Sequence, residues 1–171
     1  MLFRHPVFRF AAVFGLLTGL YFAFTVTDGF ASILQPYLRL NAQLSAAILS
    51  LLGSEATSDL TVIVSPQLSL RIARGCDAID PSAIFVAAVF AFPVSARLKL
   101  PAALAGTLFL MTLNLARIVS LYYAGIHFPN AFDFLHHDVW QALFIFLALL
   151  IWSVWASWAA GRSIEPAHGA A

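Results

Sequence analysis

Three side chains that together could perform nucleophilic acyl transfer occur at separate places in the chain: Cys76, Arg117 and His137. A thiol can act as the nucleophile, an imidazole can transfer protons, and a guanidinium can stabilise an oxyanion. Cys76 follows Gly75, which permits a close approach or an unusual backbone angle. Neighbouring arginines would lower the thiol pKa and neighbouring aspartates would raise it, so the sequence leaves that sign open. A small apolar filler is the other interpretation of a free cysteine.

Arg117 stands inside an apolar stretch, where a cation is costly and is a functional hypothesis by default. Snorkelling of an arginine from a helix end to the interface is the alternative. Asn114 lies one helical turn earlier on the same face and could help to hold the guanidinium. His136 and His137 precede Asp138, and a solvated pair at the membrane surface is the plain alternative for them. Few further ligands stand at recognisable spacing, so we expect no metal site.

The composition places these residues in a membrane protein. Of 171 residues, 61% are hydrophobic and only 10% are charged, whereas soluble domains carry about 25% charged residues. This excludes an ordinary soluble domain and a disordered chain. A net charge of +1 with scattered cations argues against nucleic-acid binding. A single cysteine excludes an intrachain disulfide framework and a cysteine-based zinc site.

Four stretches are long and apolar enough to cross a bilayer, which needs about 20 residues in a helix. They lie at about residues 8–26, 79–96, 100–125 and 139–160. Helices are expected because the backbone must satisfy its own hydrogen bonds in lipid. We therefore predict an all-α polytopic membrane protein that forms a single domain over residues 1–171.

The basic residues predict an orientation through the positive-inside rule. With the N-terminus inside, five cations fall on the inner side: Arg4, Arg9, Arg97, Lys99 and Arg162. Three cations fall on the outer side and weaken this assignment: Arg39, Arg71 and Arg74. The first span is longer than a signal-peptide core, so we expect a retained anchor, with cleavage near residues 29–31 as the alternative. This topology brings Cys76, Arg117 and His137 to the outer side.

The outer segment 28–75 begins with a stretch that has two interpretations. Residues 30–52 carry apolar side chains at roughly helical spacing, interrupted by polar ones. This pattern favours an amphipathic helix that lies on the outer leaflet or against the bundle. A fifth span is the alternative, but it would move Arg97 and Lys99 to the outside.

The second part of the outer segment has a different pattern. Residues 61–64 and 68–72 include β-branched side chains and flank Ser65-Pro66-Gln67. Such runs around a short turn predict a β-hairpin, here just before Cys76.

These features together resemble the exosortase/archaeosortase family of membrane transpeptidases. The resemblance rests on three motifs in order: Gly75-Cys76-Asp77-Ala78-Ile79, Asn114-Leu-Ala-Arg117 and His137-Asp-Val-Trp-Gln-Ala-Leu-Phe144. It covers roughly residues 40–150, and the short length resembles the compact branch called exosortase H. Family members often show Cys-Ser-Gly where this chain has Cys76-Asp77-Ala78.

The resemblance implies catalytic roles for Cys76, Arg117 and His137. The adjacent His136 is the alternative histidine, although the residues that follow His137 match the family pattern better. In the implied mechanism the Cys76 thiolate attacks a carbonyl of the substrate, and Arg117 stabilises the oxyanion or orients the thiolate. His137 would protonate the leaving amine and then activate the acceptor.

The resemblance also implies the partners. The substrate would be a secreted protein whose C-terminal sorting tail contains a short recognition motif, a hydrophobic helix and a basic cluster. The protein would span the bacterial plasma (inner) membrane with its active site outside and accept the tail helix from the lipid bilayer. It would need no cofactor and would bind no nucleic acid. Hydrolysis of the tail without transfer to an envelope acceptor stays open, and a non-enzymatic envelope scaffold or assembly subunit is the alternative.

Overall fold

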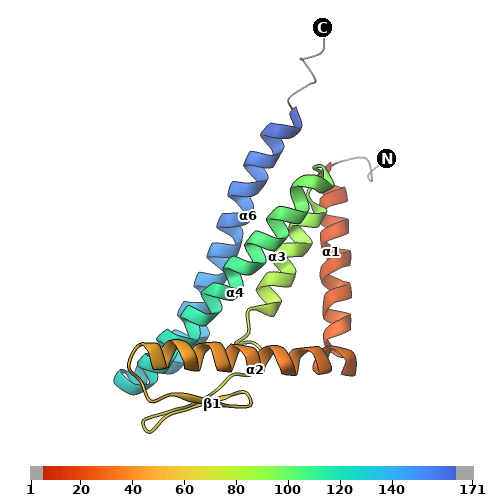
Figure 1. Cartoon of the computed structure of the whole chain (residues 1–171). Helices are drawn as coiled ribbons and strands as arrows, with labels where there is room; N and C mark the ends of the chain where they lie inside the picture. The colour runs from red at the N-terminus through yellow and green to blue at the C-terminus, as the bar shows by residue number, and fades with distance from the viewer. Residues whose placement is uncertain (1–5, 165–171) are drawn as a thin grey trace.

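Figure 1 shows the computed structural model of the chain, which describes residues 6–164. In this described part, four helices run between the two ends of the molecule: α1 (Pro6–Thr25), α3 (Ile79–Ala91), α4 (Ala96–His127) and α6 (Trp140–Ile164). A fifth long helix, α2 (Asp28–Leu51), lies across one end of them at a steep angle. The predicted inner cation Arg4 lies outside the described residues.

Three segments of the described chain are long and apolar enough to cross a membrane: Pro6–Thr25, Ala96–His127 and Pro129–Arg162. A mostly helical membrane protein is therefore confirmed, whereas the count of four spans is not. The remaining predicted span corresponds to α3, which is apolar but has only 13 residues. At 1.5 Å per residue, α3 is roughly 20 Å long, against a bilayer core of about 30 Å.

Helix α3 ends earlier than the sequence analysis predicts, at Ala91 instead of residue 96. The reason is local, because Phe92 precedes Pro93 and adopts an extended conformation. A proline disfavours the helical conformation of the residue before it, so the chain turns at this point. Helix α4 then begins at Ala96 and runs back alongside α3.

Helix α2 is amphipathic in its packing. Its buried side chains Leu34, Leu38 and Leu49 join a core cluster with Ile63 of the sheet and Tyr122 of α4. Its other side exposes large apolar residues, as a helix at a membrane surface does. α2 is not among the candidate spans, and its place across the helix ends agrees with the expected interfacial helix and not with a fifth span.

A small antiparallel sheet of three strands follows α2, in the order β1 (Thr57–Asp59), β2 (Val62–Val64) and β3 (Ser69–Arg71). The pair β2–β3 confirms the predicted hairpin, with Ile63 opposite Leu70. The sequence analysis missed β1, because its residues are short, polar and exposed and show no apolar alternation. The sheet lies beyond α2, at the end of the molecule where α1 finishes (Figure 1).

The second core cluster joins α3, α4 and α6. Phe85 and Val89 of α3 pack with Leu110 of α4 and Phe144 of α6. Gly106 of α4 lies against the Phe85 ring so closely that a Cβ atom would overlap the ring. The close approach of α3 and α4 therefore depends on a residue without a side chain at this position.

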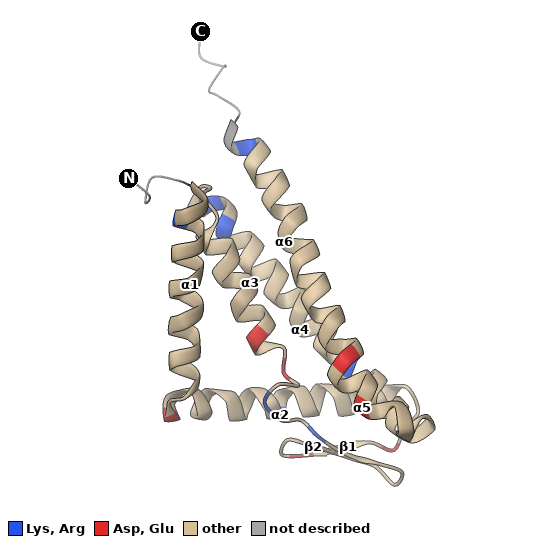
Figure 2. Ribbon diagram, turned by 180° about the vertical axis from the view of Figure 1, so that it is seen from behind, with Lys and Arg blue, Asp and Glu red and all other residues tan. Residues whose placement is uncertain are grey.

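The acidic residues lie toward one end of the molecule, whereas basic residues occur at both ends (Figure 2). Lys and Arg residues gather where α1 begins, where α3 turns into α4, and at the far end of α6. Acidic residues lie toward the opposite end, near α2 and the sheet, where further Arg residues such as Arg39 and Arg71 also lie. The basic residues at the first end agree with the positive-inside rule if the α3–α4 turn faces the cytoplasm.

Candidate active site

The thiol of Cys76 lies beside an imidazole. Cys76 belongs to the loop between β3 and α3, and its Sγ is 2.8 Å from Nε2 of His136. This histidine stands on a π-helical turn, η3 (Leu135–Val139), between the short helix α5 (Phe132–Phe134) and α6. A thiol and a base in hydrogen-bond contact form the arrangement that activates a cysteine nucleophile.

Arg117 joins the two segments that carry the thiol and the imidazole. Its Nη2 donates to the carbonyl of His136 at 3.1 Å, and its Nη1 lies 3.5 Å from the carbonyl of Gly75. The side chain is only 4% exposed, and its guanidinium carbon lies 5.7 Å from the centre of the Phe144 ring. Arg117 therefore points into the molecule, which is the opposite of a snorkelling arginine.

The structure brings together Cys76, Arg117 and His136, and it places His137 outside this group. His137 is exposed, and its Nδ1 lies 3.2 Å from the carbonyl of Asp133. Consecutive residues on a helical turn point in different directions, and here the His136 ring contacts the thiol while the His137 ring lies beside the carbonyl of Asp133. His136 thus occupies the position that the family resemblance assigned to His137.

The backbone of the cysteine loop has an unusual shape. Gly75 has φ +90° and Ala78 has φ +59°, which are left-handed conformations on both sides of Cys76. The hydroxyl of Tyr37 on α2 donates to the carbonyl of Asp77 at 2.7 Å. A carboxylate oxygen of Asp77 accepts from the N–H of Ile79 at 3.0 Å, which pairs one of the free N–H groups at the start of α3. These contacts fix the loop that presents the thiol.

Asn114 has a different partner from the expected one. Its amide donates to Oδ1 of Asn41 on α2 at 3.2 Å, and Asn41 in turn donates to the carbonyl of Tyr37 at 3.0 Å. Asn114 therefore links α4 to α2 behind the site and forms no hydrogen bond with Arg117 among the described contacts.

Tyr37 and Asn41 are supporting residues that the sequence analysis missed. The available signal is that polar groups recur at positions 37, 41 and 45, four residues apart, on the buried side of an amphipathic helix. A buried polar side chain usually has a partner, and Tyr37 and Asn41 have theirs in the cysteine loop and in α4.

The surroundings set the proton affinity of the thiol. Burial raises the pKa of Cys76 above its ordinary value, and the charge of Arg117 partly offsets that rise. The thiol is therefore mainly protonated at neutral pH and needs a base to become a thiolate. His136 is the base in contact with it. The sign that the sequence left open is thus upward, and burial is its main cause.

A small pocket of about 150 Å³ opens onto this group. Cys76, Arg117 and His136 line it together with Leu70 and Arg71 of β3 and Ile72, which follows that strand. The pocket has room for a short piece of a bound molecule next to the sulfur. It is bounded by the sheet, by α4 and by the turn that carries His136.

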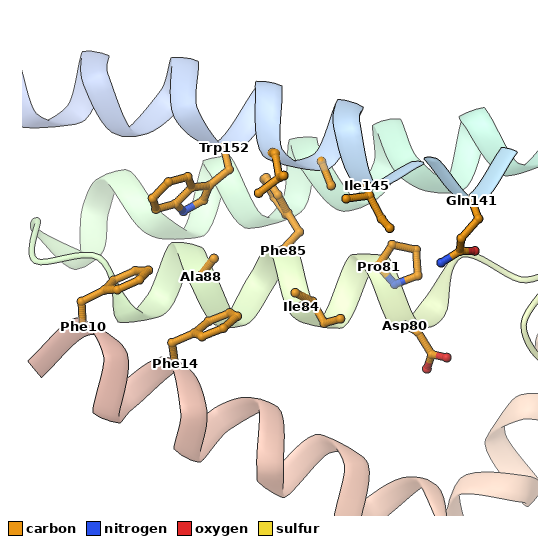
Figure 3. A pocket seen from close by; sticks show the side chains of 12 residues that line it. Phe10, Phe14, Asp80, Pro81, Ile84, Phe85, Ala88, Gln141, Ile145 and Trp152 are labelled. Carbon is orange, nitrogen blue, oxygen red and sulfur yellow. The ribbon is translucent and has the colours of Figure 1, made fainter. Parts of the chain in front are cut away.

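A second, larger groove of about 450 Å³ lies between α1, α3 and α6 (Figure 3). Its walls are apolar, with Phe10 and Trp152 toward one end and Ile84 in the middle. Asp80 and Gln141 stand at the other end, and Asp80 follows Cys76 by four residues. The hydroxyl of Tyr21 on α1 donates to Asp80, which ties α1 to the start of α3.

One family comparison matches nearly the whole chain. The family model described as Transmembrane exosortase (Exosortase_EpsH) matches residues 2–160. No curated protein and no solved structure matches the chain. The family model confirms the resemblance that the three sequence motifs indicated.

Proposed function

The chain belongs to the transmembrane exosortase family, and on that premise we propose that it is a cysteine transpeptidase that cleaves C-terminal sorting tails of secreted proteins. Family membership points to a membrane transpeptidase for sorting signals, and the apolar helices make the chain a multi-pass membrane protein. The observation that carries the finer proposal is the contact between Cys76 and His136, with Arg117 bound to both of their segments.

The first half of the reaction forms a thioester. Nε2 of His136 takes the thiol proton as Sγ of Cys76 attacks the carbonyl carbon at the recognition motif. The resulting tetrahedral intermediate carries an oxyanion. The bond to the leaving amine then breaks, and the His136 imidazolium returns its proton to that amine. The tail leaves, and the secreted protein stays bound to Cys76 as an acyl group.

The second half releases the product. An acceptor amine or hydroxyl of the cell envelope attacks the thioester carbonyl while His136 takes its proton. The carbon–sulfur bond breaks, and the Cys76 thiolate is protonated by the imidazolium. Attack by water in place of the acceptor would give hydrolysis through the same groups.

Arg117 has two contributions in this mechanism. Its hydrogen bonds to the carbonyls of Gly75 and His136 hold the thiol and the imidazole at contact distance. Its positive charge lies near Cys76, lowers the thiol pKa and stabilises negative charge that develops there. A fixed cation in a half-buried site is effective because it needs no reorganisation during the reaction.

The groove between α1, α3 and α6 supports a tail-shaped substrate. Its apolar walls suit the hydrophobic helix of a sorting tail, and its polar end at Asp80 lies near the cysteine loop. A tail helix in this groove would extend toward the end of the molecule where the basic residues gather. We place the protein in the bacterial plasma membrane, with the thiol on the outer side.

The direct test replaces the nucleophile. In cells whose only copy is Cys76→Ala, precursors with uncleaved C-terminal tails should accumulate, and mass spectrometry of membrane proteins would identify them. Cys76→Ser should also process very slowly, because a hydroxyl does not provide an accessible thiolate. Thr112→Ala, on the exposed side of α4, is the matched control for insertion and abundance. Normal processing by Cys76→Ala would overturn the proposal, and a scaffold would produce no such precursor.

A further inference from the structure

Strand β3 is an edge strand beside the thiol. In the order β1-β2-β3 only one of its edges is paired, and the pairing partner is β2. Helix α2 packs against β1 and β2. The second edge of β3, which faces away from β2, has no strand paired with it in the described sheet. A strand edge with unpaired N–H and C=O groups is a template for another extended chain.

The register shows which backbone groups are free. Val62 lies opposite Arg71, so Thr61 lies opposite Ile72, and the N–H of Ile72 donates to the carbonyl of Thr61 at 2.7 Å. Hydrogen-bonded and non-hydrogen-bonded pairs alternate in an antiparallel ladder. Arg71 therefore belongs to a non-hydrogen-bonded pair, and its N–H and C=O point away from β2.

The same alternation applies two residues earlier, at Ser69. Its register partner is Val64, and the flanking pair is closed by the N–H of Ser65, which donates to the carbonyl of Leu68 at 3.1 Å. Ser69 and Arg71 thus both direct backbone groups to the free edge. Within the described residues, the backbone N–H and C=O groups of Ser69 and Arg71 form no hydrogen bond with any residue beyond the β2–β3 pair.

Residues of β3 line the pocket that holds the thiol. Leu70, Arg71 and Ile72 line that pocket together with Cys76 and His136. A chain paired with β3 would run along the pocket and bring one of its carbonyls to the sulfur.

We infer that β3 binds the recognition motif of the substrate as an added strand, through the backbone of Ser69 and Arg71. This inference rests on the proposed function and specifies how that substrate is bound. The occupant is the extended segment of the sorting tail that precedes its hydrophobic helix. Strand addition supplies affinity through main-chain hydrogen bonds, while side-chain pockets supply specificity. It also holds the scissile peptide straight, so that its carbonyl is exposed to the thiol.

The first test removes one N–H from the free edge. Proline is tolerated on an edge strand but has no donor, whereas alanine at the same position keeps the donor. We expect Arg71→Pro to process the precursor found in Cys76→Ala cells about 2- to 10-fold more slowly than Arg71→Ala, which corresponds to the loss of one hydrogen bond. Equal rates for the two variants at matched abundance would overturn the inference.

The second test does not depend on how the proline variant folds. In a Cys76→Ala, Ser69→Cys chain, single cysteines are placed at successive positions of the same precursor, before its hydrophobic helix. Copper phenanthroline is then used to form disulfides. An added strand places every second residue on the face of Ser69, so we expect cross-links at alternate positions. Cross-links at consecutive positions, or none, would overturn strand addition.

The two proposals fail differently. If Cys76→Ala cells accumulate no precursor, the proposed function is wrong. If the precursor accumulates but the cross-links do not alternate, the thiol mechanism stands and only the binding mode is wrong.

Discussion

At the scale of single residues, replacing each of the two adjacent histidines should have a different effect on the rate of tail processing. His136→Ala removes the imidazole that contacts Cys76, and acid–base catalysis contributes about 10²–10⁴-fold, so tail processing should fall by that range. His137→Ala removes an exposed ring and should change the rate by less than about threefold. The measurement is the rate of precursor conversion at matched abundance. The reverse ranking would return the catalytic role to His137.

Arg117→Lys tests whether the forked shape of the arginine matters. Arg117 reaches two carbonyls at once, those of Gly75 and His136, and a single ammonium cannot reproduce this planar fork. We therefore expect Arg117→Lys to lose about 10²–10³-fold in processing rate with normal membrane abundance. Pulse-labelling of the precursor would measure the rate. A near-normal rate would mean that charge alone is sufficient and that the two hydrogen bonds are dispensable.

The sequence indicated Cys76 and Arg117 as candidates because their residue types are unusual at those positions. It could not decide between His136 and His137, since that choice depends on how the π-helical turn is rotated relative to the cysteine loop. π-turns occur often at functional sites but have no simple sequence signature. The family pattern after His137 favoured one residue, whereas the fold places the other beside the thiol.

At the scale of elements, the groove between α1, α3 and α6 predicts a specific effect of added bulk. Ile84 lines the groove on α3 and is 38% exposed, so Ile84→Trp should obstruct it. If the tail helix binds there, this variant should raise the precursor concentration that gives half of the maximal processing rate. The maximal rate itself should change little. The measurement is the rate in vesicles that contain increasing amounts of precursor.

Leu104→Trp is the matched control for this variant. Leu104 lies on α4, is 72% exposed, and does not line the groove. The same bulky side chain there should leave processing unchanged. If Ile84→Trp and Leu104→Trp behave alike, the tail helix binds elsewhere.

The elements themselves differ in how far the sequence predicts them. The hairpin of β2 and β3 was predictable because β-branched residues flank a short turn. The end of α3 was not placed correctly, since the apolar pattern continues to residue 96 and only Pro93 signals the break. Strand β1 has no apolar alternation, so its pairing with β2 is visible only in the fold.

At the scale of the whole molecule, the contacts at the two ends of α4 indicate that α3 crosses the membrane, although α3 is short. The end of α4 that carries Tyr122 touches the sheet, where the Tyr122 hydroxyl donates to Ser65 at 2.8 Å. The other end of α4 follows α3 directly, and Lys99 there donates to the carbonyl of Phe90 at 2.7 Å. Since α4 is a candidate span, the chain between Ile72 and Ala96 must pass from one end of it to the other.

This path means that a helix of 13 residues and the cysteine loop together cover the distance along α4. If α3 crosses the membrane, we expect the loop that carries Cys76 to lie partly within the thickness of the bilayer, because α3 starts on the side of α2 that faces the other helices (Figure 2). At this depth the thiol would be shielded from bulk water by lipid as well as by protein. It is also close to the depth at which a membrane-embedded tail would leave the lipid.

The prediction at this scale is therefore four crossings, with the short α3 as one of them. Single cysteines introduced into the Cys76→Ala chain at Thr57, Arg97, His127 and Arg162 can be tested with a membrane-impermeant maleimide. Positions 57 and 127 should react in intact cells, whereas positions 97 and 162 should react only after the membrane is opened. Labelling of positions 57 and 97 from the same side would show that α3 returns without crossing. In that case the basic end in Figure 2 could not lie wholly in the cytoplasm.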